Sequence, residues 1–133
     1  MKYLLDTNIC IYIIKKNPEK VFRKFREFQV GDVGISAITY SEMEFGVERS
    51  SNPQRNREAL YEFLAPLEIA PYPPEAAPVY GSLRAHLQRK GRIIGPLDLL
   101  IAAHASYLGC TLITNNTSEF MRVPNLLVEN WAG

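Results

Sequence analysis

Tyr3-Leu4-Leu5-Asp6-Thr7-Asn8-Ile9-Cys10 is the stretch of sequence that decides the fold. Its apolar run over residues 3–5 is typical of a buried strand, and Ile9 begins an apolar segment with the spacing of a helix. Thr7 or Asn8 is expected to cap that helix. Asp6 then lies where the strand ends, at the edge of an open α/β sheet where ligands bind. The alternative interpretation is that Asp6 only helps to cap the helix.

The composition fits one globular domain spanning residues 1–133. An apolar content of 47% is ordinary for such a domain, and a net charge of +1 leaves any nucleic-acid surface to be local. Cys10 and Cys110 are too few for a disulfide framework, so we expect reduced thiols in the cytoplasm. The N-terminus lacks a signal-peptide layout, and no apolar run approaches the roughly 20 residues that span a bilayer. We therefore expect a cytoplasmic protein without membrane contact.

Strand-like and helix-like segments alternate along the chain, which predicts an α/β fold with a mostly parallel sheet. The expected strands are residues 3–5, 33–36, 66–70, 111–114 and 126–128. The expected helices are residues 8–16, 18–28, 38–49, 55–64, 75–90 and 96–108. Gly46, inside one of these helices, should mark close packing or a break. Gly109 should end the last helix in a left-handed conformation.

Three acidic residues occupy special positions in this pattern. Asp6 follows the first strand, and Asp98 opens a helix that is apolar nearly all round. Glu42 shares a helix face with Ile38 and Phe45 by its spacing. Each acid also has an ordinary explanation, as a helix cap, a surface residue or a partner of the helix dipole. The chain has only three aspartates, however, and two of them lie at these positions.

Asn116 follows the strand expected at residues 111–114, so three carboxylates and an amide converge if the strand ends face one side. Two carboxylates about 4 Å apart repel by on the order of 4 kcal/mol at an effective dielectric near 20, so a proton or a cation must offset them. Oxygen ligands without nearby histidine or cysteine select Mg²⁺ or Mn²⁺. Such ions activate water and offset charge on a phosphate, which indicates phosphodiester hydrolysis without a covalent nucleophile.

Four short motifs occur in order along the chain. They are Leu5-Asp6-Thr7-Asn8, Tyr40-Ser41-Glu42, Ile94-Gly95-Pro96-Leu97-Asp98 with Ile101-Ala102, and Thr114-Asn115-Asn116 with Glu119-Phe120. Together they resemble the PIN-domain ribonucleases, and more closely the VapC toxins of VapBC toxin–antitoxin modules, over essentially the whole chain. The resemblance implies a PIN-like three-layer α/β/α fold. It also implies a Mg²⁺- or Mn²⁺-dependent endoribonuclease that stops translation by cutting RNA.

The resemblance also implies roles for individual residues. The residues that match the metal-holding acids are Asp6, Glu42 and Asp98. Those that resemble residues positioning the acids or a catalytic water are Thr7, Asn8 and Thr114. Asn116 belongs to the expected catalytic set, but it stands where many members carry a fourth aspartate, which puts a second metal in doubt. Glu119 is a candidate to compensate, directly or through water.

The partners implied by the resemblance are a second copy of the chain and a VapB antitoxin. The antitoxin would reach operator DNA, and its C-terminal segment would fill a groove, for which the helices over 42–64 are the candidate. An antitoxin arginine in the acidic pocket would compete with metal. The opening Leu-Asp-Thr-Asn-Ile-Cys suggests a tRNA target, in the anticodon region of initiator tRNA. Candidate phosphate contacts, or else a solvated helix end, are Arg84, Arg89, Lys90 and Arg92.

Three other functions stay open from the residues themselves. A haloacid-dehalogenase-like phosphatase would need a second aspartate where Asn8 stands. A binding module, in which the acids only receive an arginine-rich partner, predicts tight binding without metal-dependent cleavage. A DNA nuclease uses the same metal chemistry, and nothing in the sequence reads the 2′-hydroxyl of RNA. Only the resemblance selects RNA.

Overall fold

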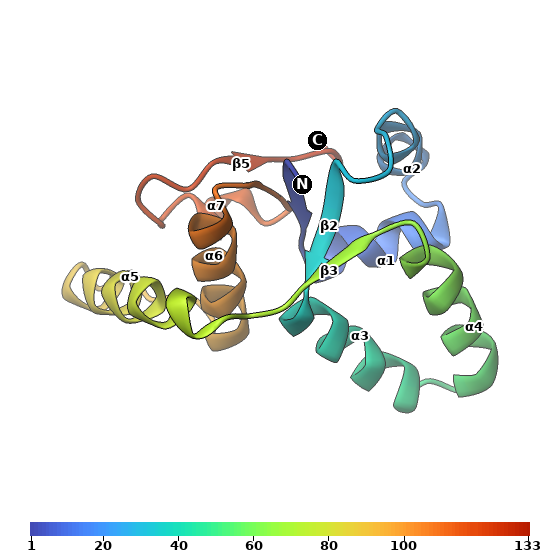
Figure 1. Ribbon diagram of the computed structural model, residues 1–133, viewed down its shortest axis with the longest axis horizontal. Coiled ribbons are helices and arrows are strands. Elements are labelled where there is room, and N and C mark those ends of the chain that lie inside the picture. The colour runs from blue at the N-terminus through green and yellow to red at the C-terminus, as the bar shows by residue number, and fades with distance from the viewer.

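A five-stranded, all-parallel sheet forms the centre of the computed structural model, which describes residues 1–133 (Figure 1). The strand order is β3-β2-β1-β4-β5. The strands are β1 (Tyr3–Leu5), β2 (Val33–Ser36), β3 (Glu68–Ala70), β4 (Thr111–Ile113) and β5 (Val128–Glu129). The predicted α/β fold with a parallel sheet is therefore confirmed, although β3 and β5 each begin two residues later than expected.

Seven α-helices and one short 3₁₀ helix connect the strands. They are α1 (Thr7–Lys15), α2 (Glu19–Arg26), α3 (Ala37–Glu48), α4 (Pro53–Leu64), the 3₁₀ helix η1 (Pro74–Ala76), α5 (Ala77–Arg89), α6 (Pro96–Leu108) and α7 (Thr117–Phe120). No helix is both long and apolar enough to span a membrane.

Two hydrophobic cores lie on opposite faces of the sheet, because successive strand side chains point to opposite faces. Leu5 belongs to the core formed with α1, α2, α3 and α4, whereas Leu4 belongs to the core formed with α5 and α6. Both leucines are fully buried. Figure 1 shows the corresponding arrangement, with α5 and α6 on one side of the strands and α1 to α4 on the other. The three-layer architecture is thereby confirmed.

Helix α1 begins directly after β1, and its N-cap is Asp6. The Asp6 Oδ1 atom accepts a 2.9 Å hydrogen bond from the backbone N–H of Ile9. The expectation that Thr7 or Asn8 caps this helix is wrong, because both residues already lie inside its first turn. Gly109 ends α6 with φ +71°, so the left-handed C-terminus predicted there is confirmed.

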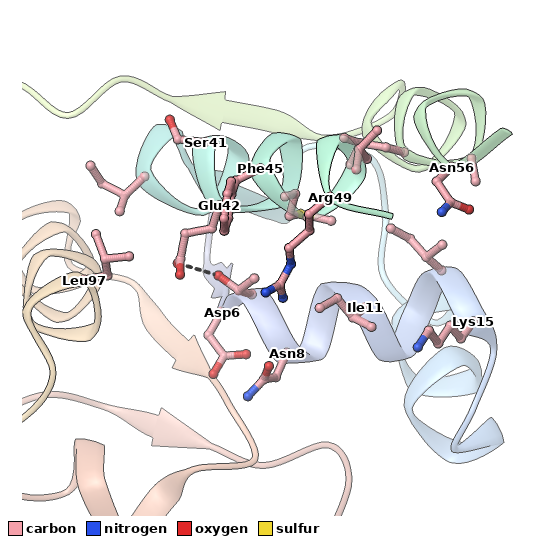
Figure 2. A pocket seen from close by; sticks show the side chains of 18 of the residues that line it. Asp6, Asn8, Ile11, Lys15, Ser41, Glu42, Phe45, Arg49, Asn56 and Leu97 are labelled. Atoms are coloured by element: carbon pink, nitrogen blue, oxygen red, sulfur yellow. Dashed lines mark hydrogen bonds between the residues drawn. The ribbon is translucent and has the colours of Figure 1, made fainter. Parts of the chain in front are cut away.

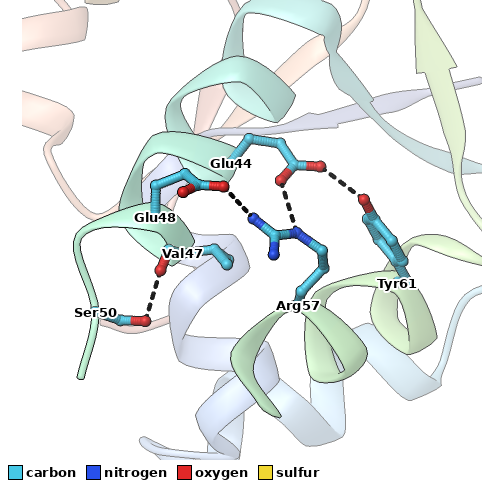
Figure 3. A network of polar contacts seen from close by, with 6 residues as sticks. All are labelled: Glu44, Val47, Glu48, Ser50, Arg57 and Tyr61. Carbon is cyan, nitrogen blue, oxygen red and sulfur yellow. Dashed lines mark hydrogen bonds and ion pairs between the residues drawn. The ribbon is translucent and has the colours of Figure 1, made fainter. Parts of the chain in front are cut away.

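Helices α3 and α4 form an arm that extends away from the sheet (Figure 1). Arg57 of α4 joins two acids of α3, with its Nη2 atom 2.6 Å from Glu48 Oε1 and its Nε atom 3.5 Å from Glu44 Oε1. The Tyr61 hydroxyl donates a further 3.1 Å hydrogen bond to Glu44, so Arg57 and Tyr61 of α4 both contact Glu44 of α3 (Figure 3). These contacts hold the two helices of the arm together.

Gly46 lies within the continuous helix α3 rather than at a break. Apart from its two chain neighbours and the backbone of α3, no atom lies within 4 Å of the position that a Cβ on Gly46 would occupy. The prediction that this glycine marks close packing or a second segment is therefore wrong. The space beside Gly46 belongs instead to the groove described below.

Candidate active site

Asp6 occupies the carboxyl end of the central strand, where burial leaves its side chain only 5% exposed. While its Oδ1 atom caps α1, its Oδ2 atom accepts a hydrogen bond from the Thr114 hydroxyl at the end of β4. Burial raises the pKa of Asp6, and these hydrogen bonds oppose the shift because they stabilise the ionised form. Asp6 is thus a helix cap that a neighbouring strand also holds in place.

Glu42 projects from α3 towards the first turn of α1. The Thr7 hydroxyl donates a 2.8 Å hydrogen bond to Glu42 Oε1, across 35 residues of sequence (Figure 2). Because Thr7 directly follows Asp6, this bond brings the Glu42 carboxylate to the same strand end. The negative charge of Glu42 accordingly contributes to the raised pKa of Asp6.

Asp98 lies in the first turn of α6 and completes a set of three acids that line one groove. Its pKa is raised from 3.8 to about 6, first by burial and then by the negative charges of Glu119, Asp6 and Glu42. We call the four carboxylates of Asp6, Glu42, Asp98 and Glu119 the acid cluster. Their negative charges repel one another.

Glu119 enters the acid cluster through contacts made by two other segments. Its Oε1 atom accepts a 3.1 Å hydrogen bond from the backbone N–H of Gly95, three residues before Asp98. Its Oε2 atom accepts a hydrogen bond from the Asn116 side chain. The Asn116 backbone N–H in turn donates a 2.9 Å bond to the Thr114 hydroxyl. Asn116 therefore holds Glu119 and Thr114 and does not line the groove itself.

A groove of about 970 Å³ runs from the acid cluster between α1 and the arm (Figure 2). Its acidic end is formed by Asp6, Glu42 and Asp98. Away from these acids the lining becomes mainly apolar, with residues from α1, α3 and α4 that include Ile11, Ile14, Met43, Val47, Ala59 and Leu60. The helices over residues 42–64, predicted as a partner-binding arm, do contribute one wall of this groove.

The acid cluster has the donor chemistry of a site for a hard divalent cation, since it offers carboxylate oxygens without histidine or cysteine. Burial raises the pKa of Asp98 first, and the negative charges of the neighbouring carboxylates raise it further, so a cation would stabilise the ionised form. No three of the protein's acidic, histidine or cysteine side chains form a preassembled metal-binding group, however. The residues fit the ion in charge and in the type of ligand atom, but their side chains are not placed as a complete ligand set.

The remaining predicted residues have two kinds of position. Asn8 is exposed and lines the groove beside Asp6. The four predicted phosphate contacts are exposed on α5 and the loop after it, and none of them lines the groove: Arg84, Arg89, Lys90 and Arg92. Their part in RNA binding stays a prediction.

Sequence reasoning did not identify the pair formed by Phe45 and Arg49, which also lines the groove. A signal for it was present. Glu42, Phe45 and Arg49 are spaced by three and four residues, so they share one face of α3. Continuing that face one turn past Phe45 would have found Arg49.

Comparison with known proteins places this geometry among characterised relatives. The sequence matches the PIN domain over residues 3–126. It is 43% identical to Ribonuclease VapC2 of Rickettsia felis over 132 residues, covering 98% of both chains. It is 42% identical to the tRNA(fMet)-specific endonuclease VapC of Shigella flexneri, covering 99% of both chains. The fold superimposes with a TM-score of 0.93 on a crystal structure of VapBC2 from Rickettsia felis bound to a promoter DNA fragment. The two sequences are 42% identical, and the match covers 98% of this chain and 99% of the other.

Proposed function

The chain belongs to the PIN-domain family, among the VapC ribonucleases of toxin–antitoxin modules, and we propose that it cuts tRNA by metal-dependent hydrolysis. The proposed consequence is an arrest of translation, which a VapB-type antitoxin prevents. The observation that carries the proposal is the gathering of Asp6, Glu42 and Asp98 at one end of a single groove. Membership of this family also leaves out a haloacid-dehalogenase-like phosphatase.

The proposed metal ligands are Asp6, Glu42 and Asp98, with Mg²⁺ or Mn²⁺ as the ion. When bound, the ion supplies an activated water and offsets the charge of the phosphate under attack. The chain's own hydroxyl groups hold the ligands in place, Thr7 on Glu42 and Thr114 on Asp6. These two bonds restrict the positions of Glu42 and Asp6 before the substrate arrives.

Glu119 is proposed to supply the charge that Asn116 lacks. It lies close enough to Asp98 for its charge to be the largest electrostatic contribution to the raised pKa of that residue. Asn116 then has a supporting role, because its side-chain amide orients the Glu119 carboxylate. The catalytic set would consist of Asp6, Glu42 and Asp98 with Glu119, and Asn116 would act through Glu119.

The groove between α1 and the arm is the proposed binding site of the antitoxin. It combines an acidic end with a mainly apolar remainder, which suits an amphipathic segment that carries an arginine at one position. That arginine would pair with the acid cluster and compete with the cation. The solved structure from Rickettsia felis is a VapBC2 assembly with promoter DNA, which supports an antitoxin partner for this chain as well. A homodimer, with operator DNA reached through the antitoxin, completes the proposed assembly.

The decisive experiment compares RNA cleavage by the wild type with that by Asp6→Asn, Glu42→Gln and Asp98→Asn. We expect Mg²⁺-dependent cleavage of tRNA by the wild type, its loss in excess chelator, and its loss in all three variants. Brief expression followed by mapping of new RNA 5′ ends would locate the cleavage site, with the anticodon region of initiator tRNA as the expected place. Robust turnover in chelator, or full activity of all three folded variants, would contradict the proposal. Cleavage of DNA in preference to RNA would select the DNA nuclease instead.

A further inference from the structure

Phe45 and Arg49 form an exposed pair on the α3 wall of the groove. The Phe45 side chain is 64% exposed, an unusual position for a large aromatic residue on a helix that also buries Met43 and Val47. The Arg49 guanidinium lies 5.3 Å from the centre of the Phe45 ring. Figure 2 shows the Arg49 side chain extending from α3 into the groove, towards α1. A flat aromatic face and a cation therefore lie together beside the acid cluster.

Arg49 is one of only two cationic residues that line the groove, the other being Lys15 near the end of α1. Figure 2 places Lys15 at the far end of the groove from Glu42, so Arg49 is the cation nearer to the acids. Arg49 forms no salt bridge, whereas Arg57 on the neighbouring helix pairs with two glutamates. The Arg49 charge is thus available for a ligand.

The space around this pair is open. Gly46 lies between Phe45 and Arg49 in sequence, and apart from its two chain neighbours and the backbone of α3, no atom lies within 4 Å of the position of a Cβ there. Ser41 and Leu97 line the groove nearby, and Leu97 is 45% exposed. The groove beside Gly46 therefore leaves room for a ligand next to the Phe45 ring.

We propose that Phe45 and Arg49 form a nucleotide-binding subsite next to the acid cluster, in which the ring stacks on an unpaired base and the guanidinium binds a backbone phosphate. This inference rests on the proposed ribonuclease function and names how the substrate is held. Aromatic rings bind single-stranded bases by stacking, with little sequence preference, and arginine binds phosphate with paired hydrogen bonds. With a net charge of only +1, the protein needs such local cations to bring an anionic strand to an acidic pocket.

The charge of Arg49 favours RNA over a peptide as the partner of this pair. An antitoxin arginine that approached the acid cluster along this wall would meet a like charge, whereas a phosphate would meet an opposite one. The apolar side chains that line the groove have no such preference. Phe45 and Arg49 are therefore assigned to the substrate, and the antitoxin remains an outcome of the test.

Binding of a short fluorescein-labelled single-stranded RNA of mixed sequence tests the subsite. All proteins carry Asp98→Asn, so that the RNA stays intact, and fluorescence anisotropy gives Kd at several salt concentrations. Arg49→Gln should weaken binding and reduce the slope of log Kd against log salt by about 0.7, the value for one lost phosphate contact on a single strand. Phe45→Leu should weaken binding by between about fivefold and a hundredfold and leave the salt slope unchanged.

Two exposed residues outside the groove lining provide matched controls, Arg55→Gln for the charge and Tyr107→Leu for the ring. Both controls should bind RNA as the parent does. In the otherwise wild-type protein, Phe45→Leu and Arg49→Gln should each raise KM for tRNA by about the factor by which they weaken RNA binding. They should leave kcat within about twofold, because the lost contacts hold the substrate and the transition state equally.

The outcomes separate this inference from the proposed function. If the wild type cleaves tRNA but Phe45→Leu and Arg49→Gln bind RNA as tightly as the parent, the subsite is wrong and the ribonuclease stands. If no RNA is cleaved but the two variants lose RNA affinity in the expected ways, the subsite stands and the ribonuclease fails. Variants that keep RNA affinity and lose only antitoxin affinity would assign the pair to the antitoxin and overturn the inference.

Discussion

Thr7 donates a 2.8 Å hydrogen bond to Glu42, and this bond joins the first turn of α1 to the middle of α3. It fixes the position of an acid that otherwise extends from an exposed face of the arm. Thr7→Val keeps the shape of the side chain and removes the donor. A hydrogen bond of this kind contributes about 1 kcal/mol, so kcat for RNA cleavage should fall by about fivefold while the fold is retained.

The control for this change is Thr7→Ser, which keeps the hydroxyl. It should retain most of the activity in the same steady-state assay, and circular dichroism should show equal helix content in both variants. Equal kcat for wild type and Thr7→Val would mean that the hydrogen bond has no part in positioning Glu42.

Asp6 has a structural and a proposed chemical role, and two substitutions separate them. Asn accepts a hydrogen bond as an N-cap almost as well as Asp, whereas Ala does not, so Asp6→Ala should be less stable than Asp6→Asn by about 1 kcal/mol in urea unfolding. Both variants should lose RNA cleavage by at least about a hundredfold, because both remove a proposed metal ligand. Activity that followed stability, high in Asp6→Asn and low in Asp6→Ala, would show that Asp6 acts only as a cap.

The raised pKa of Asp98 predicts how stability depends on pH. The native state holds the Asp98 proton up to about pH 6, while the unfolded state releases it near 3.8, so the native state binds more protons between these values. Stability contributed by this group must therefore fall as pH rises from about 4 to 6. Asp98→Asn should flatten this part of the profile and raise Tm at pH 7 relative to the wild type.

Mg²⁺ should reverse this loss, because it binds the ionised carboxylates of the native state. The increase in Tm caused by Mg²⁺ would be measured by thermal unfolding at pH 5 and at pH 7.5, with and without the ion. The Tm increase should be larger at pH 7.5, and an excess of chelator should abolish it. An equal increase at both pH values would argue against binding at the acid cluster.

Asn116→Asp would place a fourth aspartate at the end of β4. The substitution removes the amide that donates to Glu119 and places two negative charges side by side, so the metal-free protein should have a lower Tm. An added charge near a divalent cation should tighten Mg²⁺ binding by about tenfold, as measured by calorimetry. Asn116→Ser, which adds no charge, is the control and should not tighten binding. Unchanged or weaker Mg²⁺ affinity in Asn116→Asp would show that the Asn116 position does not face the metal.

Local patterns in the sequence were sufficient for the parallel α/β fold and for the positions of the acids. Asp6 and Asp98 lie where a strand ends or a helix begins, and short-range periodicity locates such junctions. The same patterns misassigned the N-cap of α1, because Thr7 and Asn8 are as suitable chemically as Asp6 and only the exact start of the helix selects among them. Gly46 was misread for a similar reason, since sequence does not show whether a glycine faces a neighbour or open space.

The contacts that hold the acids were decided by the tertiary structure. Thr114 reaches Asp6 across 108 residues, and Glu119 reaches Gly95 across 24, because β4 pairs with β1 and α7 packs beside the start of α6. The openness of the Phe45–Arg49 wall likewise depends on where α1 and α6 lie. Sequence alone determined which residues carry charge and in which local element they stand. The folded chain decided which of them meet, because contact between side chains depends on the packing of elements that no local pattern encodes.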